Sequence, residues 1–392
     1  MSEMRTASRP RRRGLRRLLL PTLILVIVYF GVLVYPPLRV AWLIWPQWQP
    51  GTLALFVLMV VPILGRLAYE WRPGRWARRV AALSMTWLGM AFMLFCLVLP
   101  WELLNLLLSF PPRASGLTLA TAALALWLVA GVNAQLLMVR QVTLTAPGID
   151  RPRRLVQISD VHIGSREPAL LRRIVARVRA LEPDAVLITG DLIDFRDIPR
   201  EDIASLGELS MPVWYCIGNH ERYVDLEAIC ERLRSLGVRV LRDEVDCSLP
   251  PFVVAGIDDA ESRLRVADGL AAIGPLPDGF RLLLYHRPDG LEDAAAAGID
   301  LMLCGHTHNG QIVPFNFLVR RVFPRIKGLH ETDRHDGGQT RLYVSTGTGT
   351  WGPLIRLGSR NEITVIRLHP SIGAVDLSPV LQTPAAEVGC ER

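Results

Sequence analysis

The stretch LVQISDVH at residues 155–162 sets a pattern that recurs along the second half of the chain. A short apolar run ends, and two polar side chains, Asp160 and His162, follow at once. Short runs rich in Val, Ile and Leu are typical of buried strands. Polar groups just past such strands lie where open α/β sheets gather their ligand sites. The stretch therefore predicts a strand that delivers a carboxylate and an imidazole to a binding site.

The same arrangement returns four more times. Apolar runs at 185–188, 213–217, 282–285 and 301–304 each precede a polar group. These groups are Asp191 and Asp194, then Asn219, His220 and Glu221, then the lone His286, and last His306 and His308. Each block alone has an ordinary explanation as a turn aspartate, a capping asparagine or a core histidine. Five in order, each after a predicted strand, favour one site for hard or borderline divalent cations.

The spacing within the blocks gives an expectation about side-chain direction. Asp160 and His162 are two residues apart, as are His306 and His308, and such side chains point the same way on an extended backbone. Gly190 precedes Asp191, and a residue without a side chain permits a tight turn close to a metal. A carboxylate among imidazoles is a candidate bridge between two cations. The sequence thus predicts a site that holds two metals.

Taken together, the blocks Asp-x-His, Gly-Asp-x-x-Asp, Gly-Asn-His-Glu, a lone His and Gly-His-Thr-His resemble the calcineurin-like metallophosphoesterase superfamily. The resemblance covers residues 150 to about 368. It implies an α/β domain of two facing β-sheets flanked by helices, an αββα sandwich. It also implies two divalent metal ions, drawn from Mn, Fe, Zn and Mg, and a phosphoester substrate.

The resemblance also implies a role for each matching residue. Asp160, His162 and His308 would hold one metal, Asn219, His286 and His306 the other, and Asp191 would bridge them. His220 would act at the leaving group, and Glu221 would orient the His220 ring. Asp194 would not be a metal ligand. Two cations about 3.5–4 Å apart can bind a hydroxide and stabilise both ends of an in-line displacement. A metal-bound water titrates near neutral pH, so no serine or cysteine nucleophile is required.

A closer similarity is to bacterial membrane-associated members, which include UDP-diacylglucosamine pyrophosphate hydrolases. Residues 305–311, GHTHNGQ, are similar to Gly-His-Thr-His-Gly-Gly-Gln of that subgroup, with Asn309 as a departure. The implied substrate is a lipid-linked phosphodiester or pyrophosphate. Two alternatives stay open: an anchored phosphatase or cyclic-nucleotide phosphodiesterase with a soluble substrate, and a non-catalytic membrane sensor or scaffold. The intact ligand set argues against the scaffold.

Residues 1–140 are of a different kind, with eight of the ten tryptophans and four long apolar stretches. The stretches lie at about 18–36, 52–69, 80–100 and 116–139, each near the ~20 residues that a transmembrane helix needs. They predict a membrane domain of four helices over residues 18–139. A basic tail at 1–17 precedes it, and a linker at 140–152 and a phosphoesterase domain at 153–392 follow.

The basic residues indicate how this membrane domain is oriented. The tail of residues 1–17 has seven arginines and one acidic residue, Glu3, which account for most of the net charge of +7. Because the tail adjoins an apolar stretch, it predicts a cytoplasmic end and no nucleic-acid partner. Arginine-rich and arginine-poor connections alternate thereafter. The alternation places the C-terminal domain in the cytoplasm, on the inner membrane of a bacterium.

Cysteine usage agrees with this compartment. The chain has six cysteines and none forms a Cys-x-x-Cys pair, so the sequence predicts free thiols in a reducing environment.

Residues 312–327, which we call the lip, follow the last histidines directly. Its apolar residues interleave with Arg320, Arg321, Arg325 and Lys327. One interpretation is a structural cap over the domain. The other is a basic, apolar surface that lies against anionic lipid and admits a lipid-linked phosphate.

Overall fold

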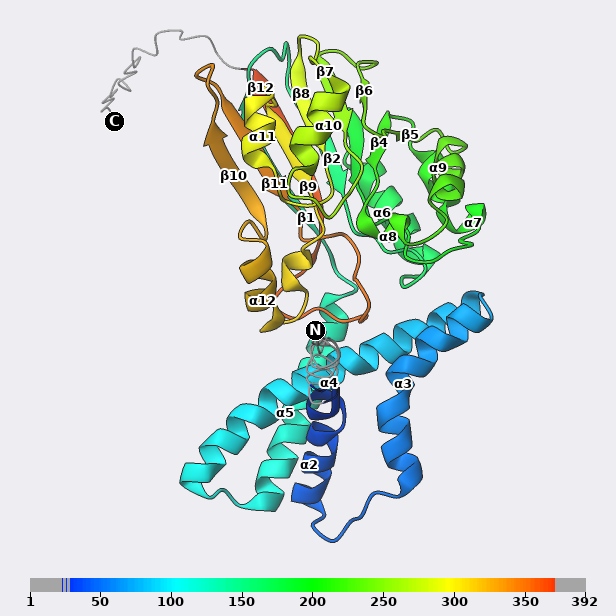
Figure 1. Cartoon of the computed structure of the whole chain (residues 1–392), viewed down its shortest axis with the longest axis vertical. Helices are drawn as coiled ribbons and strands as arrows, with labels where there is room; N and C mark the ends of the chain where they lie inside the picture. Colours follow the sequence, from blue (N-terminus) through cyan, green and yellow to red (C-terminus); the bar gives the residue numbers. More distant parts are fainter. Residues whose placement is uncertain (1–22, 24–25, 27–28, 371–392) are drawn as a thin grey trace, which may run out of the picture.

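The computed structural model describes residues 23, 26 and 29–370. The basic tail, most of the first predicted transmembrane stretch and Cys390 lie outside this range. Figure 1 shows two parts, a set of helices from the first 133 residues and an α/β domain on top of them. The five described cysteines are free, as the sequence predicts.

Two six-stranded sheets form the α/β domain. The first has the order β1 (Leu137–Ala146), β12 (Asn361–Pro370), β2 (Arg153–Ile158), β3 (Ala185–Thr189), β4 (Val213–Cys216) and β5 (Arg239–Val240). The second has the order β10 (Gly328–Asp333), β11 (Gln339–Val344), β9 (Leu301–Cys304), β8 (Phe280–Leu284), β7 (Phe252–Gly256) and β6 (Glu244–Asp246). The sheets face each other across a core that includes Leu187 and Trp214 from one and Leu282 and Leu303 from the other.

Helices cover the two outer faces. α6 (Pro168–Ala180) and α9 (Leu226–Arg234) pack on the first sheet, and α10 (Arg265–Ile273) and α11 (Leu291–Ala296) pack on the second. The predicted αββα sandwich is therefore confirmed. The remaining elements are short: α7 (Arg200–Ile203), η1 (Ala204–Glu208), α8 (Asn219–Arg222), η2 (His308–Gly310) and α12 (Phe315–Val322).

Strand direction brings the polar blocks together. β2, β3 and β4 are parallel neighbours in the first sheet, and β8 and β9 are parallel neighbours in the second. These are the five strands that the sequence predicts before the polar blocks. Because parallel strands end at the same edge of a sheet, all five blocks lie along one rim of the domain.

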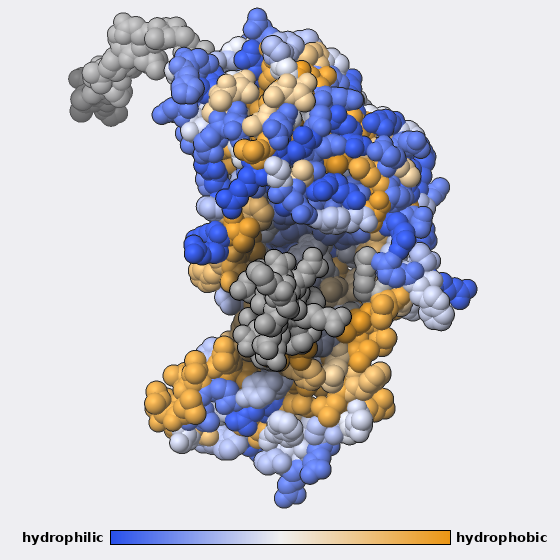
Figure 2. Space-filling view, in the orientation of Figure 1, coloured by the Kyte–Doolittle hydropathy of each residue, from blue (hydrophilic) through white to orange (hydrophobic). Residues whose placement is uncertain are grey.

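The described helical part includes α2 (Tyr35–Ile44), α3 (Thr52–Trp71), α4 (Arg75–Leu108) and α5 (Pro112–Asn133). Two of these, α4 and α5, are long and apolar enough to cross a membrane. A third, α3, qualifies only if its two halves, which meet at a 55° bend between Val61 and Ile63, count as one span. Figure 2 shows hydrophobic residues gathered over the helical part, whereas the α/β domain is mostly hydrophilic.

The linker expected at residues 140–152 is in large part a strand. Three residues separate the end of α5 from β1, which pairs with β12 in parallel from Leu137 to Ala146. The predicted span at 116–139 is correspondingly too long, since its last residues belong to β1. The alternation of Val142, Leu144 and Ala146, two of which are buried, is a strand signal.

The helices also pack directly on the α/β domain. Met93 of α4 and Ala130 of α5 form one apolar cluster with Ile312 and Ile355. Gly89 lies so close to Pro353 that a Cβ there would sit 2.8 Å from the proline Cβ. The backbone N–H of Leu354 donates a hydrogen bond to Oγ1 of Thr86 on α4 (3.0 Å). The loop at 351–356 is therefore fixed against α4.

Candidate active site

The five blocks converge into a chain of three overlapping groups at the rim. The first group is Asp160, His162 and His308, the second is His162, Asp191 and His220, and the third is Asp191, His286 and His306. Within each group the potential ligand atoms lie within 4.8 Å of one another. Since His162 and Asp191 are each shared by two groups, the geometry is that of a centre that can hold adjacent cations.

The backbone reaches this geometry in a way that the sequence interpretation missed. We expected Asp160 and His162, and likewise His306 and His308, to project from extended backbone. All four instead have positive φ, from +49° to +69°, as does Asp191 at +50°. Non-glycine residues seldom adopt this left-handed region, and such residues cluster at functional sites. Tight turns, not extended strands, therefore carry these side chains to the centre.

Gly190 has the role that the sequence predicts. Its φ is +80°, and a Cβ at this position would lie 2.6 Å from Nδ1 of His286 and 2.7 Å from the backbone of Gly218. Only glycine allows β3, β4 and β8 to bring their polar ends this close.

Pairs of imidazoles face each other across the centre. Nε2 of His162 lies 3.0 Å from Nε2 of His308, and Nδ1 of His306 lies 3.1 Å from Nε2 of His286. The far nitrogen of His286 is 2.8 Å from the carbonyl of Thr189. A donor hydrogen bond of this kind fixes the tautomer and leaves the near nitrogen free to bind a metal.

The chemistry of the donor set fits divalent cations. Oδ1 of Asn219 is buried and has no hydrogen-bond partner among the described residues, which is costly unless a cation takes that place. Burial lowers the pKa of His306 to about 3 and that of His308 to about 4, so both rings are neutral ligands. Burial also disfavours a charged His286, but the adjacent Asp191 carboxylate outweighs it and raises the pKa to about 10. A metal at Asp191 would replace that proton.

Asp194, which we expected not to be a ligand, connects two histidines. Its Oδ1 lies 2.5 Å from Nδ1 of His162 and 2.8 Å from Nδ1 of His220, and its other oxygen accepts a hydrogen bond from Ser165. Burial disfavours a charged His220, yet the nearby carboxylates, first Asp194 and then Asp191, together outweigh it and raise the pKa of the ring to about 10. The side chain of His220 remains 19% exposed, so it can reach a substrate. Asp194 therefore orients His220.

Glu221, which we expected to orient His220, has no hydrogen bond to that ring among the described residues. Its carboxylate is fully buried and accepts hydrogen bonds from four backbone N–H groups, at distances of 2.7–3.1 Å. The donors belong to Asp191, Leu192, Ile193 and Gly218. These bonds occupy its oxygens, so Glu221 braces the turn that presents Asp191.

Arg356 is a further residue that the sequence did not single out. Its side chain is fully buried, and one guanidinium nitrogen lies 3.0 Å from Nδ1 of His308. The same group donates to the carbonyls of Thr346 and Gly349. Burial lowers the pKa of Arg356 to about 9. An arginine in a loop carries no sequence signal that separates it from a surface arginine, so this contact needed the structure.

The fold and the centre define a metal-dependent hydrolase of layered α/β architecture. A family model described as calcineurin-like phosphoesterase matches residues 153–310. Phosphodiesterase YaeI of Escherichia coli is 31% identical over 55% of this chain and 82% of its own length. The chain belongs to the calcineurin-like metallophosphoesterase family, and it is a metal-dependent phosphoester hydrolase. Proteins of this fold hold two divalent metals, as the His and Asp cluster here would.

One further relative matches more of the chain than this domain, and another matches about the domain alone. The uncharacterized metallophosphoesterase Cj0846 of Campylobacter jejuni is 29% identical over 74% of this chain and 84% of its own length. A zebrafish protein named transmembrane protein with metallophosphoesterase domain is 35% identical over 55% of this chain. The match covers only 53% of the zebrafish protein. Its name agrees with the apolar helices described above.

Proposed function

We propose that the chain is a membrane-anchored phosphodiesterase or pyrophosphatase with a lipid-linked substrate. Asp160, His162 and His308 would hold one divalent cation, and Asn219, His286 and His306 would hold the other, with Asp191 between them. When bound, the two cations would supply an activated water and neutralise charge that develops on the phosphoryl group. The domain would face the cytoplasm at the inner membrane of a bacterium.

His220 would serve as the proton donor to the leaving oxygen. Its Nδ1 is held by Asp194, and its Nε2 lies 3.9 Å from Asp191 on the side of the centre. The ring of Trp351, half exposed, lies edge-on at 6.3 Å from His220. His220 and Trp351 thus border the open side of the centre, where a leaving group would depart.

The observation that carries the lipid assignment is the position of the lip. Its helix α12 has no buried residue, and Phe317, Leu318 and Val322 are each more than 60% exposed. Phe315 packs edge-on against Phe92 of α4, with ring centroids 6.2 Å apart. A structural cap would bury these side chains, so the exposed face supports the interpretation as a lipid-contacting surface.

The lip also connects α4 to the metal centre. At its α4 side, Phe315, Phe317 and Leu318 line a cavity of about 360 Å³ together with residues 92–100 of α4. At its other end, the ring of Phe323 lies 5.0 Å from that of His306. An acyl chain along α4 and a phosphate at the centre would therefore lie on opposite sides of one short helix.

The metal assignment is tested with Asp191→Asn. We expect loss of both cations and a fall in phosphodiesterase activity of at least ~10²-fold, since metal catalysis supplies several kcal/mol. Metal content is measured per chain after adding Mn²⁺, Mg²⁺, Fe²⁺ and Zn²⁺ separately. Asp336→Asn, in the exposed turn between β10 and β11, is the matched control. Two retained equivalents with full activity would remove Asp191 from the centre.

The lipid assignment is tested with Leu318→Ser against Leu264→Ser. The two leucines are 63% and 64% exposed, so both changes remove equal surface without disturbing a core. Burial of one leucine in lipid contributes ~1.5–3 kcal/mol, which predicts about a tenfold loss of kcat/KM on a lipid-linked diester for Leu318→Ser alone. A soluble diester should be hydrolysed equally by both variants. Equal rates on the lipid substrate would favour a soluble substrate.

Orientation is tested separately by a reporter fused after Arg392. Cytoplasmic activity of the reporter is expected from the arginine pattern. Activity on the opposite side would place the substrate in the other leaflet and leave the metal assignment unaffected.

A further inference from the structure

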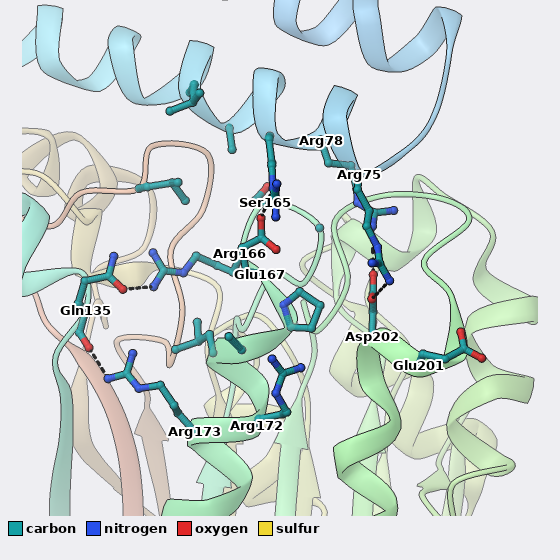
Figure 3. Close-up of a pocket in the computed structure, with 18 residues that line it drawn as sticks. Arg75, Arg78, Gln135, Ser165, Arg166, Glu167, Arg172, Arg173, Glu201 and Asp202 are labelled. Carbon is teal, nitrogen blue, oxygen red and sulfur yellow. Dashed lines mark hydrogen bonds and ion pairs between the residues drawn. The ribbon is translucent and has the colours of Figure 1, made fainter.

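A second charged cavity lies where α4, α5 and the α/β domain meet. It has a volume of about 590 Å³, within the range of ~300–1,000 Å³ typical of ligand pockets. Figure 3 shows α4 above it, α6 below it and the turn that contains Gln135 at one side. It is separate from the metal centre, since none of the proposed ligands lines it.

Cations outnumber anions in the lining by two to one. Six arginines and three acidic residues line the cavity: Arg75, Arg78, Arg79, Arg166, Arg172, Arg173, Glu167, Glu201 and Asp202. Asp202 is shared by Arg75 at 3.4 Å and Arg78 at 3.0 Å, and Glu167 binds Arg79 at 2.7 Å. These pairs fix α4 to the domain. Among the described residues, no carboxylate pairs with the other three arginines.

Arg166 is the clearest sign of a missing anion. Its side chain is 5% exposed, and its guanidinium donates only to the carbonyl of Ala134 and the side-chain oxygen of Gln135. No carboxylate among residues 29–370 pairs with it. Arg173 donates to the carbonyl of Gln135. Burial, followed by the charge of Arg173, lowers the pKa of Arg166 to about 10. A buried guanidinium beside a second cation is costly without a counterion.

Two further features point toward an anion. Arg172 is exposed and has no hydrogen bond or ion pair with any residue that the structure describes, and Figure 3 shows it rising from α6 into the space between Arg166 and Asp202. α6 also begins here, without a side-chain cap or an acidic residue in its first turn. Its free N–H groups and the positive end of its dipole favour an anion.

The wall on the α4 side is apolar. Ala82 and Leu83, with Leu83 65% exposed, follow Arg79 by one helical turn and begin the apolar part of the helix. An amphipathic ligand could thus place its charge among the arginines and its chain along α4. Arginine binds phosphate oxygens in a bidentate manner, which favours phosphate over a simple carboxylate.

We propose that this cavity binds a phosphate-bearing anion, best matched by the headgroup of an anionic phospholipid of the surrounding membrane. The ligand would complete the contact between α4 and α6 and hold the domain against the bilayer. The site does not depend on the chemistry of the metal centre.

The test measures lipid binding to the full chain in detergent by native mass spectrometry, with metals removed by a chelator. Phosphatidylglycerol, phosphatidylcholine and diacylglycerol are compared, and inorganic phosphate is added as a competitor. We expect one phosphatidylglycerol per chain and weaker binding of diacylglycerol, which has no phosphate. Arg172→Gln with Arg173→Gln should weaken phosphatidylglycerol binding at least ~10-fold.

The matched control is Arg234→Gln with Arg263→Gln. Both of these arginines are exposed on the α/β domain and change the net charge equally. Arg172→Gln alone is the variant least expected to affect folding, because it removes no hydrogen bond or ion pair with a described residue. A loss of binding in this variant would therefore not result from misfolding. Competition by inorganic phosphate at millimolar concentration would assign the site to free phosphate as well as lipid, and absence of competition would assign it to lipid alone. Equal binding of diacylglycerol, or equal loss in the control pair, would overturn the proposal.

Discussion

The metal centre and the arginine-lined cavity are both clusters of charge, but the chain encodes them differently. Every residue proposed for the centre lies within a few positions of a strand end, in a short block that can be read along the sequence. The cavity takes its arginines from α4, from the turn before α6 and from α6 itself, with Gln135 from the turn after α5. A site formed by short sequence blocks can be predicted from the sequence. A site assembled from separate elements can be recognised only in the folded structure.

The largest effect is expected for His220→Ala, a change within one of the sequence blocks that form the metal centre. We expect both metals to stay bound and turnover to fall by about 10²–10⁴-fold, the usual contribution of a general acid. The loss should shrink for a nitrophenolate leaving group, which needs little protonation. Steady-state rates on a nitrophenyl diester and an alkyl diester measure the difference. An equal loss on both would show that His220 positions the phosphate without donating a proton.

A smaller effect is expected for Asp194→Asn, which acts through its neighbours. The change weakens the support of both His162 and His220, and the loss of such a partner typically costs ~10–10² in metal affinity or activity. The control is Glu221→Gln. If Glu221 only braces the backbone turn, its replacement should lower the melting temperature but preserve the difference between good and poor leaving groups. If instead Glu221→Gln alone abolished that difference, Glu221 would orient His220 after all.

The smallest effect on turnover is expected at the junction with the helices. Gly89→Leu would push Pro353 and Ile355 away from α4, because a Cβ alone already comes within 2.8–3.1 Å of them. Overpacking of this kind costs ~1–3 kcal/mol of stability. Gly131→Leu, where nothing lies within 4 Å of the added Cβ, is the control. Melting temperature in detergent should fall only for Gly89→Leu, with soluble-substrate turnover changed less than severalfold. Equal melting temperatures would mean that the loop at 351–356 adapts.

The sequence was informative where one physical rule decided the structure. Apolar runs of four or five residues gave the five strands, and parallel pairing then brought Asp160, Asp191, His286 and His306 to one rim. The role of Gly190 in the tight turn before Asp191 could also be predicted, because glycine has no side chain. These inferences depend on local composition and on the geometry of sheets.

The sequence was less informative where several rules compete. An Asp-x-His block fits extended backbone and left-handed turns equally well, and only the packed loops select the turns. Glu221 directly follows His220 along the chain and Asp194 lies 26 residues before it. The choice between these two acids depends on which backbone N–H groups bind the Glu221 carboxylate. Strand β1 was not predicted, because residues 140–152 were interpreted as a linker and the strand forms only by pairing with a distant segment. Its partner, β12, lies more than two hundred residues away.

Strand β1 also has a mechanical consequence. Ten consecutive residues of β1 pair with β12, and only three residues separate β1 from α5. A domain on a flexible linker could change its orientation relative to the membrane. Here α5 is followed almost directly by β1 of the first sheet. The catalytic rim therefore stays at one height above the ends of α4 and α5. In a bilayer, this connection would set a fixed distance between the membrane surface and the metal centre. Among phosphoesters of identical chemistry, the spacer between lipid and phosphate would then decide which bond is cut.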